Sequence, residues 1–93
     1  MHILLARYHL RLEHAQSLKE KRGHLKRLIA ALQSRHNIAI AESDHHDLWH
    51  DAEISVVTLS LQKEVAEATE RAIAETLERD SDFVLGEWQL EWL

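Results

Sequence analysis

Residues 3–32, ILLARYHLRLEHAQSLKEKRGHLKRLIAAL, change their hydrophobic period part-way along. Apolar and polar side chains alternate over residues 3–12, and this period of two predicts a strand with one buried face. Ser17 and Glu20 then have the S-x-x-E spacing of a capping box, which marks the start of a helix. The apolar side chains that follow at helical spacing predict one buried stripe; they are Leu18, Leu25, Leu28, Ile29 and Leu32.

The rest of the chain predicts four more elements and one turn after this helix, which we expect to end near Asn37. They are a short strand over residues 38–43, a turn over 44–50, a central strand over 54–61, a helix over 62–79 and a last strand over 83–93. The inner face of the second helix is expected to carry Val65, Ala68, Thr69, Ala72, Ile73 and Thr76.

The resulting order, β-α-β-β-α-β, predicts the architecture. Crossover connections are right-handed and the two middle strands form a hairpin. We therefore expect an α+β, ferredoxin-like fold: a four-stranded antiparallel sheet in the order 4-1-3-2, with two helices on one face. A chain of 93 residues has room for one such domain, spanning residues 1–93. The second face of the sheet stays open to a partner.

Composition limits the class of protein. The chain has no cysteine, which excludes disulfides and thiolate metal sites and is typical of a cytoplasmic protein. No apolar run reaches the ~18 residues of a membrane span, so we expect no membrane partner. The net charge of the chain is −5, but the charges are unevenly distributed. Residues 1–37 contain eight Lys and Arg and only two Asp and Glu, whereas residues 38–93 contain three Lys and Arg and fourteen Asp and Glu. This asymmetry predicts a basic side and an acidic side.

The first helix concentrates the positive charge. Its candidate nucleic-acid-binding residues are Lys19, Lys21, Arg22, Lys26 and Arg27. Several of them occupy the first turns, where the helix dipole disfavours a cation by ~0.3–1 kcal/mol. A row of cations in this place favours a use such as binding the phosphates of ribosomal or other structured RNA. The alternative is that the cations pair with acids of the second half of the chain.

The turn at residues 44–51, DHHDLWHD, contains three His and three Asp. Imidazole and carboxylate ligands suit Zn²⁺ or Ni²⁺, which makes a metal site a second hypothesis. The candidate ligands are His45, His46 and His50. The alternative is structural, because Asp44 and Asp47 can accept backbone N–H groups in an Asx-type turn.

The last strand offers a third candidate surface. Strict alternation places Trp88, Leu90 and Trp92 on one face and Phe83, Leu85 and Leu93 on the other. One set must then lie on the open side of the sheet, and we assign Trp88, Leu90 and Trp92 to a homodimer interface there. Stacking of RNA bases is the alternative, but residues 54–61 of the central strand contain no aromatic residue.

Nothing in the sequence indicates catalysis. There is no nucleophile motif, P-loop or dinucleotide fingerprint, and two glycines cannot build a phosphate-binding loop. No pair of carboxylates stands out as an acid and a base. We therefore expect no catalytic residue, no cofactor and a non-enzymatic binding protein.

A set of motifs spread along the chain resembles the YlxP-like family of small bacterial proteins, a domain of unknown function. The residues that carry the resemblance are SLKEKR at 17–22, Leu25-Lys26, Asn37, Ala41-Glu42, Asp44 and DLW at 47–49. The resemblance implies a ferredoxin-like fold, a bacterial cytoplasmic protein, no established enzymatic activity and, through gene neighbourhood, a link to translation. At His50-Asp51 the family more often has Gln-Arg, so the turn loses its basic character here.

Overall fold

The computed structural model describes residues 1–93 and confirms the expected order of elements. The strands and helices are β1 (His2–Arg11), α1 (Leu18–Arg35), β2 (Ile38–Asp44), β3 (Asp51–Ser60), α2 (Lys63–Arg79) and β4 (Val84–Trp92). Neither helix has the length and the apolar character that a bilayer crossing requires.

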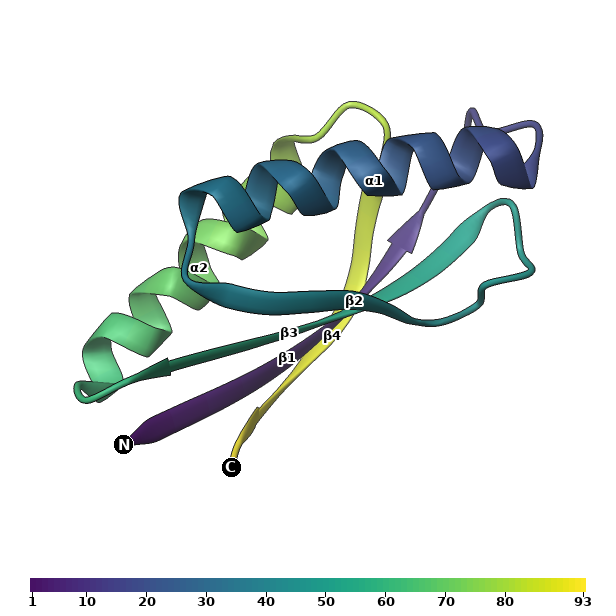
Figure 1. Cartoon of the computed structure of the whole chain (residues 1–93). Coiled ribbons are helices and arrows are strands. Elements are labelled where there is room, and N and C mark those ends of the chain that lie inside the picture. Colours follow the sequence, from purple (N-terminus) through teal and green to yellow (C-terminus); the bar gives the residue numbers. More distant parts are fainter.

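The strands form one antiparallel sheet in the order β2-β3-β1-β4, which is the predicted order read from the other edge. Both helices cover the same face, and the second face is open (Figure 1). α1 packs beside the edge strand β2, whereas α2 lies over β3 and β1. The α+β, ferredoxin-like arrangement is confirmed.

The start of α1 follows the capping-box prediction. Ser17 Oγ accepts a hydrogen bond from the Glu20 N–H at 3.1 Å. The Glu20 carboxylate reaches back to the N–H of Gln16 at 2.9 Å, one residue before the usual partner. Two amides that would otherwise lack partners are thereby satisfied. At the other end the helix stops at Arg35, two residues before Asn37.

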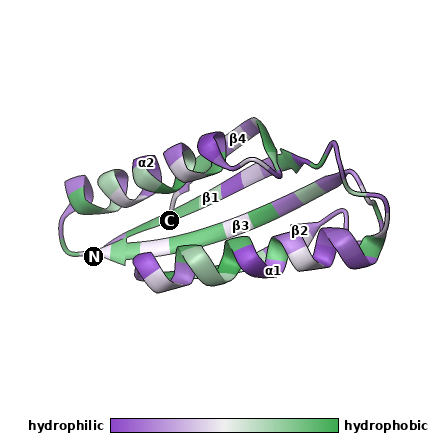
Figure 2. Cartoon of the chain, turned by 90° about the horizontal axis from the view of Figure 1, so that it is seen from above, coloured by the Kyte–Doolittle hydropathy of each residue, from purple (hydrophilic) through white to green (hydrophobic).

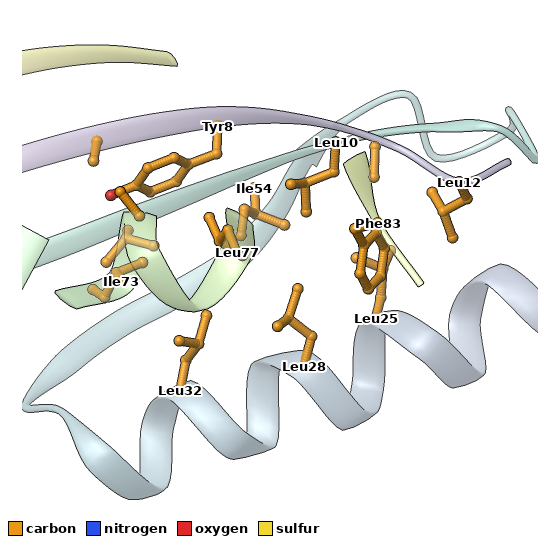
Figure 3. Packing of buried hydrophobic residues seen from close by; sticks show 14 of the residues in the cluster. Tyr8, Leu10, Leu12, Leu25, Leu28, Leu32, Ile54, Ile73, Leu77 and Phe83 are labelled. Atoms are coloured by element: carbon orange, nitrogen blue, oxygen red, sulfur yellow. The ribbon is translucent and has the colours of Figure 1, made fainter. Parts of the chain in front are cut away.

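The core fills the space between the helices and the sheet. β1 buries every second side chain, as its alternation predicted, and α1 buries Leu25, Leu28 and Leu32. Figure 3 shows these three leucines pointing from α1 toward the residues of the sheet and of α2. Leu18 and Ile29, the flanks of the predicted stripe, are half-buried.

α2 turns a different face inward from the predicted one. Val65 is 48% exposed, and the buried side chains are Ala66, Glu70, Ile73, Ala74 and Leu77. Of the residues predicted to face inward, Ile73 alone is buried, because the helix turns the charged Glu70 rather than Val65 toward the core. Glu70 is 8% exposed and accepts a hydrogen bond from the Tyr8 hydroxyl at 2.8 Å. Burial first, and then the bond to Glu70, raise the pKa of Tyr8 well above its usual value, so Tyr8 stays a donor.

β4 contains a bulge that changes which side chains share a face. Leu85 pairs with Leu10 and Trp88 pairs with Tyr8, so β4 has one residue more than β1 between these pairs. The bulge includes Gly86, where an added Cβ would lie 3.1 Å from His9 Nδ1. The expectation that Leu85 and Trp88 lie on opposite faces was wrong, because strict alternation does not allow for the extra residue.

We predict that Tyr8→Phe lowers the free energy of unfolding by roughly 1–3 kcal/mol, because it leaves the buried Glu70 carboxylate without its donor. Urea denaturation measures the effect. The Tyr8→Phe/Glu70→Leu variant removes both polar groups and should recover most of the loss. An unchanged midpoint in Tyr8→Phe would contradict the importance of this bond.

The same bond predicts a pH dependence. The folded protein keeps Tyr8 protonated, whereas in the unfolded chain the phenol ionises near its ordinary pKa of 10.0. Stability from this group is therefore present below pH 10.0 and is lost as the pH rises above it. Unfolding curves should fall more steeply with pH above this value in the wild type than in Tyr8→Phe.

Candidate functional site

Three of the five cations assigned to the first helix lie free on its outer surface. Lys19, Arg22 and Lys26 are exposed, and none of them forms an ion pair. Their spacing of three and four residues places them on one side of α1, about one helical turn (~5.4 Å) apart. Hydrophilic residues recur along the visible surface of α1 in Figure 2. We call Lys19, Arg22 and Lys26 the cation row.

Lys21 does not belong to this surface. It is 1% exposed, and its ammonium donates to the carbonyls of His45 at 2.5 Å and Leu48 at 2.7 Å. Its Nζ also lies 2.9 Å from Glu42 Oε2 and forms an ion pair with that carboxylate. The two groups are not aligned for a hydrogen bond, so the buried Oε2 accepts none. The assignment of Lys21 to a nucleic-acid interface was wrong, because burial leaves it no access to a partner.

Arg27 is also engaged within the molecule. Its guanidinium donates to Asp80 Oδ1 at 3.1 Å and to Asp82 Oδ2 at 2.9 Å. The hydrogen bond to Asp80 is the main cause of a raised pKa for Arg27, with the two carboxylate charges adding to it. These bonds tie α1 to the segment between α2 and β4. We therefore leave Arg27 out of the cation row.

A groove lies beside Arg22 and Lys26 of the cation row. It has a volume of about 450 Å³ and lies beside α1 where β2 forms the edge of the sheet. Arg22 and Lys26 form its charged margin, Glu42 closes it, and its remaining lining is Leu25, Ile29, Ala30 and Gln33. One feature of the sequence indicates this groove, which is the apolar Ile29 at the margin of the buried stripe.

The histidines of the turn point to three different places. His46 Nε2 contacts the Glu42 carbonyl at 3.1 Å, and His50 Nε2 contacts the Ala15 carbonyl at 3.1 Å. His45 lies instead beside Asp44 and Glu53. The predicted metal site of His45, His46 and His50 was therefore wrong, since a turn does not keep the i, i+4 spacing of a helix. Asp44 does accept a backbone N–H, but it is that of the next residue, His45, at 2.7 Å, and not the N–H two residues on that defines an Asx turn.

The aromatic row of β4 lies on the helix side of the sheet. Trp88, Leu90 and Trp92 pair with Tyr8, Ala6 and Leu4, whose side chains enter the core. Their placement on the open face was wrong, and the bulge at Gly86 explains why. They nevertheless stay 42%, 49% and 40% exposed, since β4 is an edge strand. Lys63 of α2 covers part of Trp92, with Nζ 5.3 Å from the ring centroid.

Comparison with known proteins agrees with the resemblance that the motifs indicate. Residues 3–89 match the family described as "Protein of unknown function (DUF503)". The chain belongs to this family. It is similar to the "Uncharacterized protein YlxP" of Bacillus subtilis (strain 168), with 37% identity over 46 residues. The aligned segment spans 50% of this chain and 50% of that protein. The YlxP-like resemblance is thus confirmed, and the DUF503 family adds no known activity.

We predict that Lys21→Met lowers the free energy of unfolding by roughly 3 kcal/mol, because it leaves Glu42 and two carbonyls without their ammonium. The Lys21→Met/Glu42→Gln variant should recover part of that loss. Lys19→Met is the matched control and should change stability by less than about 0.5 kcal/mol, since Lys19 is exposed. Equal effects of Lys19→Met and Lys21→Met in urea denaturation would contradict the assignment.

Proposed function

We propose that the chain is a non-enzymatic binding module that contacts ribosomal or other structured RNA through the cation row. The observation that carries the proposal is the contrast within α1. Lys21 and Arg27 are held by acids and carbonyls of the second half of the chain, whereas Lys19, Arg22 and Lys26 stay exposed without an acidic partner. A chain with net charge −5 thus keeps a local positive surface.

The position of the row on the helix supports a phosphate ligand. Lys19 and Arg22 lie in the first turns of α1, which begins at Leu18. Positive charge there opposes the helix dipole by about 0.3–1 kcal/mol for each residue. A helix selected for stability alone would carry acids in these positions. Backbone phosphates convert this cost into favourable contacts, and such contacts position a protein on RNA without reading its sequence.

The groove supports the same surface. Its margin is cationic through Arg22 and Lys26, while Leu25, Ile29 and Ala30 make its lining apolar. A flat, fully charged surface would offer only phosphate contacts. A groove of about 450 Å³ also has room for an unstacked base or a sugar next to the phosphates.

The non-enzymatic and cytoplasmic parts of the proposal rest on composition and motifs. The chain has no nucleophile motif and no phosphate-binding glycine loop. It has no cysteine, which suits a reducing compartment.

We predict that Lys19→Glu/Lys26→Glu weakens binding to fragments of ribosomal RNA at least about tenfold, because each reversal replaces attraction to phosphate with repulsion. Fluorescence anisotropy at two salt concentrations measures it, and the slope of log K against log salt should fall in magnitude. Arg71→Glu/Arg79→Glu is the control, since it changes the net charge equally on the exposed side of α2. No binding by the wild type at low salt, or equal loss in the control, would contradict the proposal.

A second candidate function is self-association through β4. This strand is an edge of the sheet, and four large apolar side chains along it are at least 40% exposed: Val84, Trp88, Leu90 and Trp92. An edge of this length with apolar side chains can pair with a second copy, which joins two sheets into one. The proposed dimer interface is therefore the edge of β4 and not the open face of the sheet, to which strict alternation had assigned Trp88, Leu90 and Trp92.

We predict that the wild type sediments as a dimer at micromolar concentration and that Leu90→Lys shifts it toward the monomer, because the charge would be buried at the pairing edge. Leu59→Lys is the control: Leu59 is also 49% exposed but lies on β3, away from this edge. A wild-type monomer at every concentration in analytical ultracentrifugation would rule out the second candidate.

A further inference from the structure

The open face of the sheet carries a cluster of imidazole and carboxylate groups near the end of the β2–β3 hairpin. Asp44, His45 and Glu53 each offer one ligand atom, and these three atoms all lie within 4.8 Å of one another. His9, on β1, extends the cluster, because its ring centroid lies 5.7 Å from that of His45. Side chains from β1, β3 and the end of β2 with its turn therefore meet at one place.

The separations are close to those that a metal ion imposes. Bonds of about 2.0–2.2 Å in a tetrahedral site place ligand atoms roughly 3.5 Å apart and two imidazole centroids roughly 5 Å apart. The observed limit of 4.8 Å needs an inward shift of about 1 Å from side chains that are partly exposed. Rotation about their own χ angles can supply such a shift without moving the backbone.

Neighbouring polar groups already orient the ligands. Ser43 Oγ donates to Glu53 Oε1 at 2.7 Å, which leaves Glu53 Oε2 for an ion. His9 Nε2 lies 2.9 Å from Asp51 Oδ1, and its other ring nitrogen, Nδ1, lies against Gly86. His9 therefore joins the site by turning Nε2 from Asp51 to the ion. From the helix side, Lys21 fixes the carbonyl of His45. Supporting bonds of this kind strengthen metal binding by holding ligands in place.

The charge at this place also favours a cation. Asp44, Asp51 and Glu53 bring three carboxylates to one end of the hairpin, and none of them forms an ion pair with Lys or Arg. Their only pairing is with His9 and His45. Two arginines lie nearby without forming an ion pair: Arg7 lines a hollow of about 160 Å³ together with His9 and Glu53, and Arg11 is opposite Asp51 on the neighbouring strand. A divalent ion would offset the mutual repulsion of these carboxylates.

We propose that Asp44, His45 and Glu53 bind a first-row divalent transition metal, with His9 as a fourth ligand. Mixed imidazole and carboxylate ligands suit zinc, whereas magnesium and calcium prefer oxygen alone. The bound ion ties the turn to β3 and β1 and so stabilises the end of the hairpin. His9 and Glu53 alternate along their strands with side chains that enter the core, so the site lies on the face of the sheet opposite the two helices.

Zinc titration of the chelator-treated chain without a histidine tag tests the proposal. Isothermal calorimetry should show one bound equivalent, and His45→Ala and Glu53→Gln should each weaken binding at least about tenfold. His46→Ala is the matched control: it removes an imidazole from the same turn but one that contacts the Glu42 carbonyl, and it should leave affinity within about twofold. Magnesium should give no comparable binding.

Thermal unfolding supplies a second readout, because a ligand that binds only the folded state raises its melting temperature. Zinc should raise the melting temperature of the wild type and of His46→Ala, but not that of His45→Ala. Equal losses in His45→Ala and His46→Ala would show scattered binding by exposed histidines and overturn the proposal. Absence of a bound equivalent in the wild type would overturn it as well.

Discussion

The ammonium of Lys21, buried at the start of α1, is the interaction on which this end of the molecule depends. An ammonium has three protons to donate, and the structure surrounds it with the carbonyls of His45 and Leu48 and the carboxylate of Glu42. A buried charge without partners costs several kcal/mol, so the turn cannot leave α1 without exposing or stranding this group. The start of α1, the end of β2 and the turn therefore behave as one unit.

That arrangement divides a basic helix into two functional parts. Lys21 and Arg27 use the acidic and carbonyl groups of the second half of the chain to hold the fold together. Lys19, Arg22 and Lys26 receive no such partner and stay exposed. Lys21 also holds the turn from the helix side through the carbonyl of His45. The His45 side chain lies beside the carboxylates of Asp44 and Glu53 on the open face.

The elements were predictable because each rests on local pattern. The alternation of β1, the capping box of Ser17 and Glu20, and the order of strands and helices sufficed for the fold. The burial of two charged residues, Lys21 and Glu70, was not predicted, although their spacing from the buried apolar residues of each helix indicates it. Lys21 precedes Leu25, Leu28 and Leu32 at four, seven and eleven residues, and Glu70 similarly fits the spacing of the buried face of α2. Charged side chains are usually exposed, so we expected both residues to lie in solvent. Their burial depends on partners that are far away in the sequence, which a local pattern does not show.

The most direct test observes the Lys21 ammonium itself by ¹H–¹⁵N NMR of the side-chain NH₃⁺ groups at neutral pH. The account predicts a slowly exchanging signal for Lys21, because its protons are held by oxygens and shielded from water, and rapid exchange for Lys19 and Lys26. Assignment by Lys21→Met should remove that signal alone. An ammonium at Lys21 that exchanges as fast as those of Lys19 and Lys26 would contradict the account.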